Sequence, residues 1–210
     1  MRTLPHPVIR SRWKDRPLRL VVSAFAALLA VSAVNVEPVA ARSDDHASVP
    51  GQIEGRPGPG QASPLQARVD AAAPGATVEV GSGAYDGDLW IDRPLRLIGR
   101  GRPVLRGSGG GSVVRVRAAD VTLEGFDIDG RAGGDLGRDS SGIHVSAPRV
   151  HVRDCRIRQT LFGIYLREAD DAVIESTEVT GIPGRDPGEN GSGIHVWNSQ
   201  RFRLTGNRER

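Results

Sequence analysis

Three closely related octets recur in the second half of the chain: SGIHVSAP at 141–148, FGIYLREA at 162–169 and SGIHVWNS at 192–199. Their GIHV, GIYL and GIHV cores begin at residues 142, 163 and 193, so the spacings are 21 and 30 residues. A fixed period in this range, built only of short strands, is typical of a solenoid in which each repeat forms one coil. The repeat therefore predicts an all-β fold, a right-handed parallel β-helix.

The segments around the octets are short runs of Val, Ile and Leu at alternate positions, broken by Gly and Asp. This pattern indicates short strands separated by turns. The second strand of each unit is predicted to begin at Val121, Val150, Ala172 and Phe202. Spacings near 30 reflect two inserted loops, 131–141 and 182–191, which we expect to leave the same corner of the coil.

Stacking of the coils predicts columns of equivalent side chains. Residues two apart in each octet face the core, so the residue between them points outward. One outward column is predicted to contain Arg115, His144, Tyr165 and His195. Two further columns alternate acid, base and acid, and opposite charges on adjacent strands contribute roughly 0.2–1 kcal/mol per pair. These columns are Glu124, Arg153, Glu175 and Asp127, Arg156, Glu178.

The N-terminal part of the chain has the features of an export signal. A basic region from Arg2 to Arg19 precedes an apolar run at 20–34, which is shorter than the ~20 apolar residues that span a bilayer. We predict a cleaved signal peptide over 1–41, a flexible linker over 42–62 and β-helix repeats over 63–210. A short capping helix is expected to open the repeats, with Ser63 as N-cap and Pro64 at the first helical position.

Charge argues against a nucleic-acid-binding protein, and cysteine content excludes a domain stabilised by intrachain disulfides. Residues 1–41 hold six of the 28 basic and two of the 25 acidic side chains, which leaves 22 and 23 in the rest of the chain. The mature protein is therefore close to neutral, and no nucleic-acid partner is expected. Cys155 is the single cysteine, so no intrachain disulfide can form, and we predict a buried, inert thiol.

The combination of LFGIYL at 161–166 with GSGIHVWN at 191–198, after PGATVEV and VTLEGFDIDG, resembles the NosD family. The resemblance implies a periplasmic, non-enzymatic accessory protein for the copper maturation of nitrous oxide reductase. Its partners would be an ABC-type ATPase with its permease and nitrous oxide reductase, and it would meet the membrane only through them. Members of that family are longer, so this chain is expected to be an N-terminal fragment whose β-helix is truncated at its C-terminal end.

Copper, as a transient cargo, would need His, Cys or Met ligands. The candidate metal residues are His144 and His195, which share a column but lie two coils, or ~10 Å, apart. A ladder of stacked surface histidines is the alternative explanation.

A partner or ligand surface is predicted where the two inserted loops flank this column. Its candidates are Tyr165, Trp197, Asp139, Asp186, Glu189 and Asn190, although the loop acids also have a simpler role in turning the chain.

A polysaccharide-binding or polysaccharide-degrading β-helix is the alternative function. A glycosidase needs two carboxylates about 5–9.5 Å apart across a cleft. Asp170 with Asp171, and Asp127 with Asp129, are the candidate pairs. Both pairs have structural explanations, at a turn and in a charge column, so no catalytic residue is assigned.

Overall fold

The computed structural model describes residues 63–133, 140–185 and 191–210. The predicted signal peptide and linker lie outside the described residues. Within those three ranges, no helix is long and apolar enough to cross a membrane.

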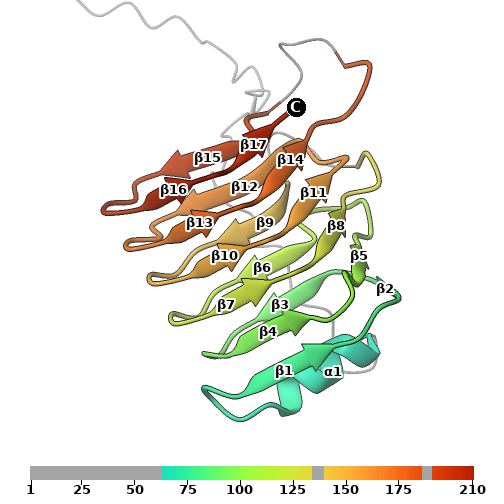
Figure 1. Ribbon diagram of the computed structural model, residues 1–210, viewed down its shortest axis with the longest axis vertical. Coiled ribbons are helices and arrows are strands. Elements are labelled where there is room, and N and C mark those ends of the chain that lie inside the picture. Colours follow the sequence, from blue (N-terminus) through green and yellow to red (C-terminus); the bar gives the residue numbers. More distant parts are fainter. Residues whose placement is uncertain (1–62, 134–139, 186–190) are drawn as a thin grey trace, which may run out of the picture. The chain divides into compact units, whose positions relative to one another are not determined.

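The described chain forms three parallel sheets that wind around one core, with one short helix, α1 (Pro64–Ala71), at the N-terminal end (Figure 1). Each coil contributes one strand to each sheet in turn. Sheet A contains β1 (Thr77–Val80), β4 (Arg96–Gly99), β7 (Thr122–Glu124), β10 (His151–Arg153), β13 (Val173–Glu175) and β16 (Arg203–Thr205). Sheet B contains β2 (Ala84–Asp86), β5 (Val104–Arg106), β8 (Asp127–Asp129), β11 (Arg156–Arg158), β14 (Glu178–Thr180) and β17 (Arg208–Glu209). Sheet C contains β3 (Leu89–Ile91), β6 (Val114–Val116), β9 (Ser141–Val145), β12 (Phe162–Arg167) and β15 (Ile194–Trp197).

The octets stack as the repeat predicts, and the fold is a right-handed parallel β-helix. Ile143, Ile164 and Ile194 lie opposite one another on β9, β12 and β15. Ile143 and Ile164 are fully buried, as are Leu123, Val152 and Ile174 of sheet A and Ile128 of sheet B. Burial of these aliphatic rows supplies most of the stabilisation, because each buried side chain contributes about 1.5–3 kcal/mol relative to an exposed one.

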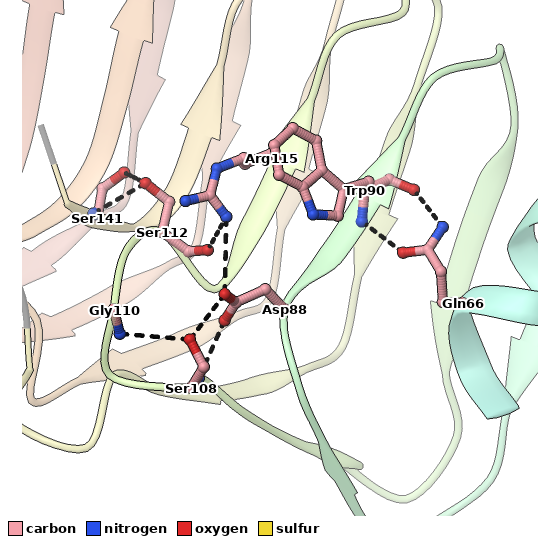
Figure 2. A network of polar contacts seen from close by, with 8 residues as sticks. All are labelled: Gln66, Asp88, Trp90, Ser108, Gly110, Ser112, Arg115 and Ser141. Atoms are coloured by element: carbon pink, nitrogen blue, oxygen red, sulfur yellow. Dashed lines mark hydrogen bonds and ion pairs between the residues drawn. The ribbon is translucent and has the colours of Figure 1, made fainter. Parts of the chain in front are cut away.

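Helix α1 covers the first coil. The Ser63 hydroxyl accepts a hydrogen bond from the Gln66 amide at 3.2 Å, as an N-cap does, and Leu65 and Val69 are buried in the core. The Gln66 side chain then bonds both backbone groups of Trp90: it accepts from the amide at 2.7 Å and donates to the carbonyl at 3.0 Å. Since β3 is the edge strand of sheet C, this side-chain amide replaces a neighbouring strand there (Figure 2).

The two insertions leave the same corner, as predicted. Both lie between a strand of sheet B and the next strand of sheet C, from β8 to β9 and from β14 to β15. The charge columns have the predicted register, with Arg153 opposite Glu124 and Glu175, and Arg156 opposite Asp127 and Glu178.

Candidate functional site

The outer face of sheet C carries the column of side chains predicted from the octets. Arg115 pairs with His144, His144 with Tyr165 and Tyr165 with His195 in the parallel register. Trp90 lies opposite Arg115 and extends the column by one coil toward the N-terminus. The column therefore crosses every strand of the sheet.

Its C-terminal half is a stack of aromatic rings. The Tyr165 ring lies 5.1 Å from the ring of His144 and 4.8 Å from that of His195, the latter nearly parallel at 26°. Phe162 meets Tyr165 edge-on, with 5.5 Å between centroids, and lies 5.3 Å from His195. Contacts of this geometry add ~0.5–1.5 kcal/mol beyond the area that they bury. Tyr165 is only 6% exposed, so it supports the cluster from within.

Trp197 is the exposed aromatic residue of this face. It lies at the end of β15, two residues after His195 and therefore on the same side of the sheet, opposite Arg167 of β12. Its side chain is 58% exposed. Of the predicted surface residues, the structure thus places Tyr165 inside the cluster and Trp197 at the solvent boundary. Asp139, Asp186, Glu189 and Asn190 lie outside the described residues.

The described residues do not fit a preformed metal site. His144 and His195 lie on opposite sides of Tyr165, whose ring stacks against both imidazoles. The described part of the chain contains no group of three or more His, Cys, Asp or Glu side chains that could hold an ion. Ligands of one transition metal bond at ~2 Å each, so two imidazoles separated by a ring cannot share it.

Cys155 is buried, as predicted. Its thiol donates to the Arg153 carbonyl at 3.4 Å. Burial raises the pKa of this thiol to about 12, against a much smaller lowering by backbone hydrogen bonds. The thiolate is the form that binds metals and reacts with electrophiles, so Cys155 supplies neither function at neutral pH.

The N-terminal half of the column is a buried Trp–Arg cluster that the sequence analysis missed (Figure 2). Trp90 is 3% exposed, and its ring contacts two guanidinium groups, with Arg115 at 4.6 Å and Arg117 at 4.7 Å from the centroid. Arg115 is 8% exposed, donates to the Ser112 carbonyl at 2.5 Å and lies 3.9 Å from Asp88. Burial, and then the charge of Arg117, lowers the pKa of Arg115 to about 10.

A Gly- and Ser-rich loop at 107–112 is fixed beside this cluster. The Asp88 carboxylate accepts from the Ser108 amide at 3.0 Å and from its hydroxyl at 2.8 Å. The Ser112 and Ser141 hydroxyl groups lie 3.1 Å apart and connect the loop to β9. The signal that could have located this cluster is the alignment of LWI with VRV, which puts Trp90 directly opposite Arg115.

The candidate catalytic carboxylates form ion pairs. Asp171 binds Arg201 at 2.7 Å and 3.0 Å, and Asp170 accepts from the same guanidinium at 3.2 Å. The hydrogen bond from Arg201 lowers the pKa of Asp171, the opposite of what a general acid needs. Asp129 binds Arg158 at 3.0 Å, and Asp127 lies 3.6 Å from Arg102. These carboxylates therefore have structural partners.

No protein-family model matches the chain. It is 28% identical over 118 residues to a Stutzerimonas stutzeri protein named "Probable ABC transporter binding protein NosD", covering 55% of this chain and 27% of the relative. A Pseudomonas aeruginosa protein of the same name is 28% identical over 129 residues, covering 60% and 30%. The chain thus spans under a third of these relatives. The resemblance to NosD is confirmed over that region.

Among solved structures, the chain is similar to an alginate lyase from a Paenibacillus strain. The TM-score is 0.50 at 17% identity, over 69% of this chain and 63% of the lyase. At that identity the likeness shows a shared β-helix fold. The fold occurs in enzymes, and by itself it does not make this chain one.

Proposed function

We propose that this chain is a non-catalytic accessory protein that works with an ABC transporter. The observation that carries the proposal is its identity with two relatives whose name states ABC transporter binding. The ion pairs of the candidate carboxylates support a non-catalytic role, because Asp171 and Asp129 are each bound by an arginine.

The specific role that we propose is copper delivery to nitrous oxide reductase in the periplasm, after export by the signal peptide at 1–41. Copper is the cargo of this process. The stacked Tyr165 ring between His144 and His195 favours a chain that docks partners over one that carries the ion. A Cu(I) titration should therefore give the same binding for the parent protein and for the His144→Ala/His195→Ala variant. Binding that this variant loses would assign copper carriage to the two histidines.

The docking surface in this proposal is the outer face of sheet C around Trp197. Exposed aromatic residues are enriched at the centres of protein interfaces because they bury a large area at small entropic cost. The ring stack of His144, Tyr165 and His195 lies beside Trp197 and holds the strand ends in one arrangement. A rigid surface of this kind loses little conformational entropy when a partner binds.

The test is co-purification with the co-expressed ABC permease and ATPase. Trp197→Ala should weaken recovery of the complex on the order of tenfold or more, as truncation of a central interface aromatic does. Phe202→Ala is the matched control, because Phe202 is 40% exposed, lies five residues after Trp197 in the chain and lies outside sheet C. Equal recovery of the Trp197→Ala variant and the parent would reject this surface, and no recovery of the parent would reject the partner.

Binding or degradation of a polysaccharide is the second candidate function. The exposed ring of Trp197 on the outer face of sheet C favours it, since exposed aromatic rings stack against the apolar faces of sugars. Purified protein should then bind alginate or pectin in a pull-down, with Trp197→Ala weaker than the parent. Depolymerisation of either polymer would replace the accessory role with an enzymatic one.

A further inference from the structure

The described chain comprises six coils. The first is β1–β3, the second β4–β6, the third β7–β9, the fourth β10–β12, the fifth β13–β15 and the sixth β16–β17 (Figure 1). Each coil also includes the residue two positions before its sheet A strand, at the corner between sheets C and A. Arg149 of the fourth coil and Asp171 of the fifth occupy this corner, both with left-handed backbone angles.

The outward charges of sheets A and B and of this corner alternate in sign from coil to coil. Odd coils carry acids: Glu79 and Asp86 in the first, Asp120, Glu124, Asp127 and Asp129 in the third, and Asp171, Glu175 and Glu178 in the fifth. Even coils carry bases: Arg96 and Arg106 in the second, Arg149, Arg153, Arg156 and Arg158 in the fourth, and Arg201, Arg203 and Arg208 in the sixth. The sign of a coil is therefore the same at several corners and faces at once.

The contacts between neighbouring coils follow this alternation. Each of these ion pairs joins an acid of an odd coil to a base of an even coil: Glu79–Arg100, Asp92–Arg117, Asp120–Arg149, Glu124–Arg153, Asp129–Arg158, Asp171–Arg201 and Glu178–Arg210. Their nitrogen–oxygen distances lie between 2.6 Å and 3.3 Å. Opposite charges on adjacent strands stabilise, and like charges directly opposite each other destabilise.

Asp154 and Arg131 depart from the alternation, and each has a partner two coils away. Asp154, an acid of the fourth coil, binds Arg102 of the second coil at 2.5 Å. Arg131 follows the sheet B strand of the third coil and lies 3.8 Å from Asp86 of the first. Both departures thus pair coils of equal parity.

The core itself distinguishes one coil from the next only weakly. At the central inward positions of sheet C, three consecutive coils present Ile143, Ile164 and Ile194. The matching positions of sheet A are similar, with Leu123, Val152 and Ile174 in register. A coil that stacked on the wrong neighbour would bury nearly the same aliphatic groups, so burial alone leaves the order of coils weakly specified.

We propose that the alternating charges form a neighbour code that fixes which coil stacks on which. In the native order the acids and bases that lie opposite each other on neighbouring coils have opposite sign, as Arg153 does to Glu124 and Glu175. If one coil is skipped, an acidic coil meets an acidic coil, for example with Glu124 opposite Glu175, and the ladders of sheets A and B become repulsive together. This role is independent of the docking surface on sheet C.

The test reverses the sign of the fourth coil in the full chain, with Arg149→Asp, Arg153→Glu and Arg156→Glu. These three arginines each lie between acids of the third and fifth coils, so six favourable juxtapositions become repulsive. We expect the unfolding equilibrium constant in urea to rise on the order of a hundredfold. A neutral variant with Gln at the same positions should lose less, because it removes attraction without adding repulsion.

The dependence of stability on NaCl concentration distinguishes charge repulsion from a general loss of stability. Added NaCl screens the native attraction, so it should lower the stability of the parent, whereas it should raise that of the reversed variant by screening repulsion. Adding Asp120→Arg, Glu124→Arg and Asp127→Arg restores attraction between coils three and four, but it sets a basic third coil against the basic second coil, where Asp127 of the parent lies 3.6 Å from Arg102. The added substitutions should therefore recover less than half of the loss. The proposal is overturned if the reversed and neutral variants are equally stable. It is also overturned if added NaCl changes the stability of the parent and of the reversed variant in the same direction. A reversed variant that does not fold, beside a folded neutral one, supports it.

Discussion

The outer face of sheet C and the outer faces of sheets A and B are built on the same coils, yet they carry different chemistry. On sheets A and B the outward residues form charge ladders, in which Arg153 binds Glu124 and Arg158 binds Asp129. On sheet C the equivalent column is aromatic and cationic, from Trp90 to His195. The same backbone geometry therefore supports two side-chain patterns.

The contrast suggests different roles: the charge ladders of sheets A and B stabilise the fold, and the outer face of sheet C is available for binding. A charge ladder is explained by its partners, because guanidinium groups such as those of Arg153 and Arg158 bind a carboxylate on the next coil. The sheet C column has no such requirement, and beside its last member, His195, lies Trp197, which is 58% exposed. Tryptophan is enriched among the residues that contribute most to binding at protein interfaces, so this exposed ring favours a binding role for this face.

The largest expected effect on stability comes from removing the central ring of the aromatic stack on sheet C. Tyr165→Ala removes a nearly buried ring with three ring contacts and should lower the free energy of unfolding by about 2–4 kcal/mol. Urea denaturation followed by far-UV circular dichroism measures the change. Trp197→Ala, on the same face, should change stability by less than about 0.5 kcal/mol. Equal losses in the two variants would contradict the distinction between a supporting and an exposed ring.

Much of the fold could be predicted from the sequence, because the stacking of coils follows from one local rule. Aliphatic residues two apart must face inward, so aligning Ile143, Ile164 and Ile194 fixes the register of sheet C and the column that contains His144 and His195. The alternating charges gave an independent check, since an incorrect register would have placed like charges together.

The candidate site was less predictable, because its contacts depend on the rotamers of its long side chains. Nothing in the octets shows that Phe162 packs over Tyr165 and leaves it 6% exposed. In the Trp90 cluster, aligning LWI with VRV predicts the Trp90–Arg115 pair, but not the approach of Arg117, which lies one residue beyond β6. Such directions are set by the rotamers of neighbouring residues, which the sequence pattern does not specify.

The pH dependence of stability due to Cys155, which is buried between β10 and β11, is expected to be an effect of intermediate size. Because burial raises the pKa of its thiol from 9.0 to about 12, the unfolded chain releases the thiol proton at a lower pH than the folded chain does. The contribution of Cys155 to stability is thus fully present below pH 9 and is lost as pH rises toward 12. At pH 10 the parent should lose about 1 kcal/mol more than Cys155→Ala, relative to pH 7. Parallel pH profiles for the two proteins would show that the thiol ionises freely in the folded state.

The smallest expected effect is the coupling free energy of a single ion pair on sheet A, which can be compared with that of a ring pair on sheet C. A double-mutant cycle on Glu124→Gln and Arg153→Gln should give a coupling free energy of about 0.5 kcal/mol, because both side chains of this 2.6 Å pair are roughly one-third exposed. The same cycle on Tyr165→Ala and Phe162→Ala should give a larger value, about 1 kcal/mol, and one that salt does not change. The two cycles separate the faces by mechanism, since 0.5 M NaCl should abolish most of the first coupling. If both couplings fell with salt, the aromatic face would owe its cohesion to charge, and the division between the two surfaces would have to be abandoned.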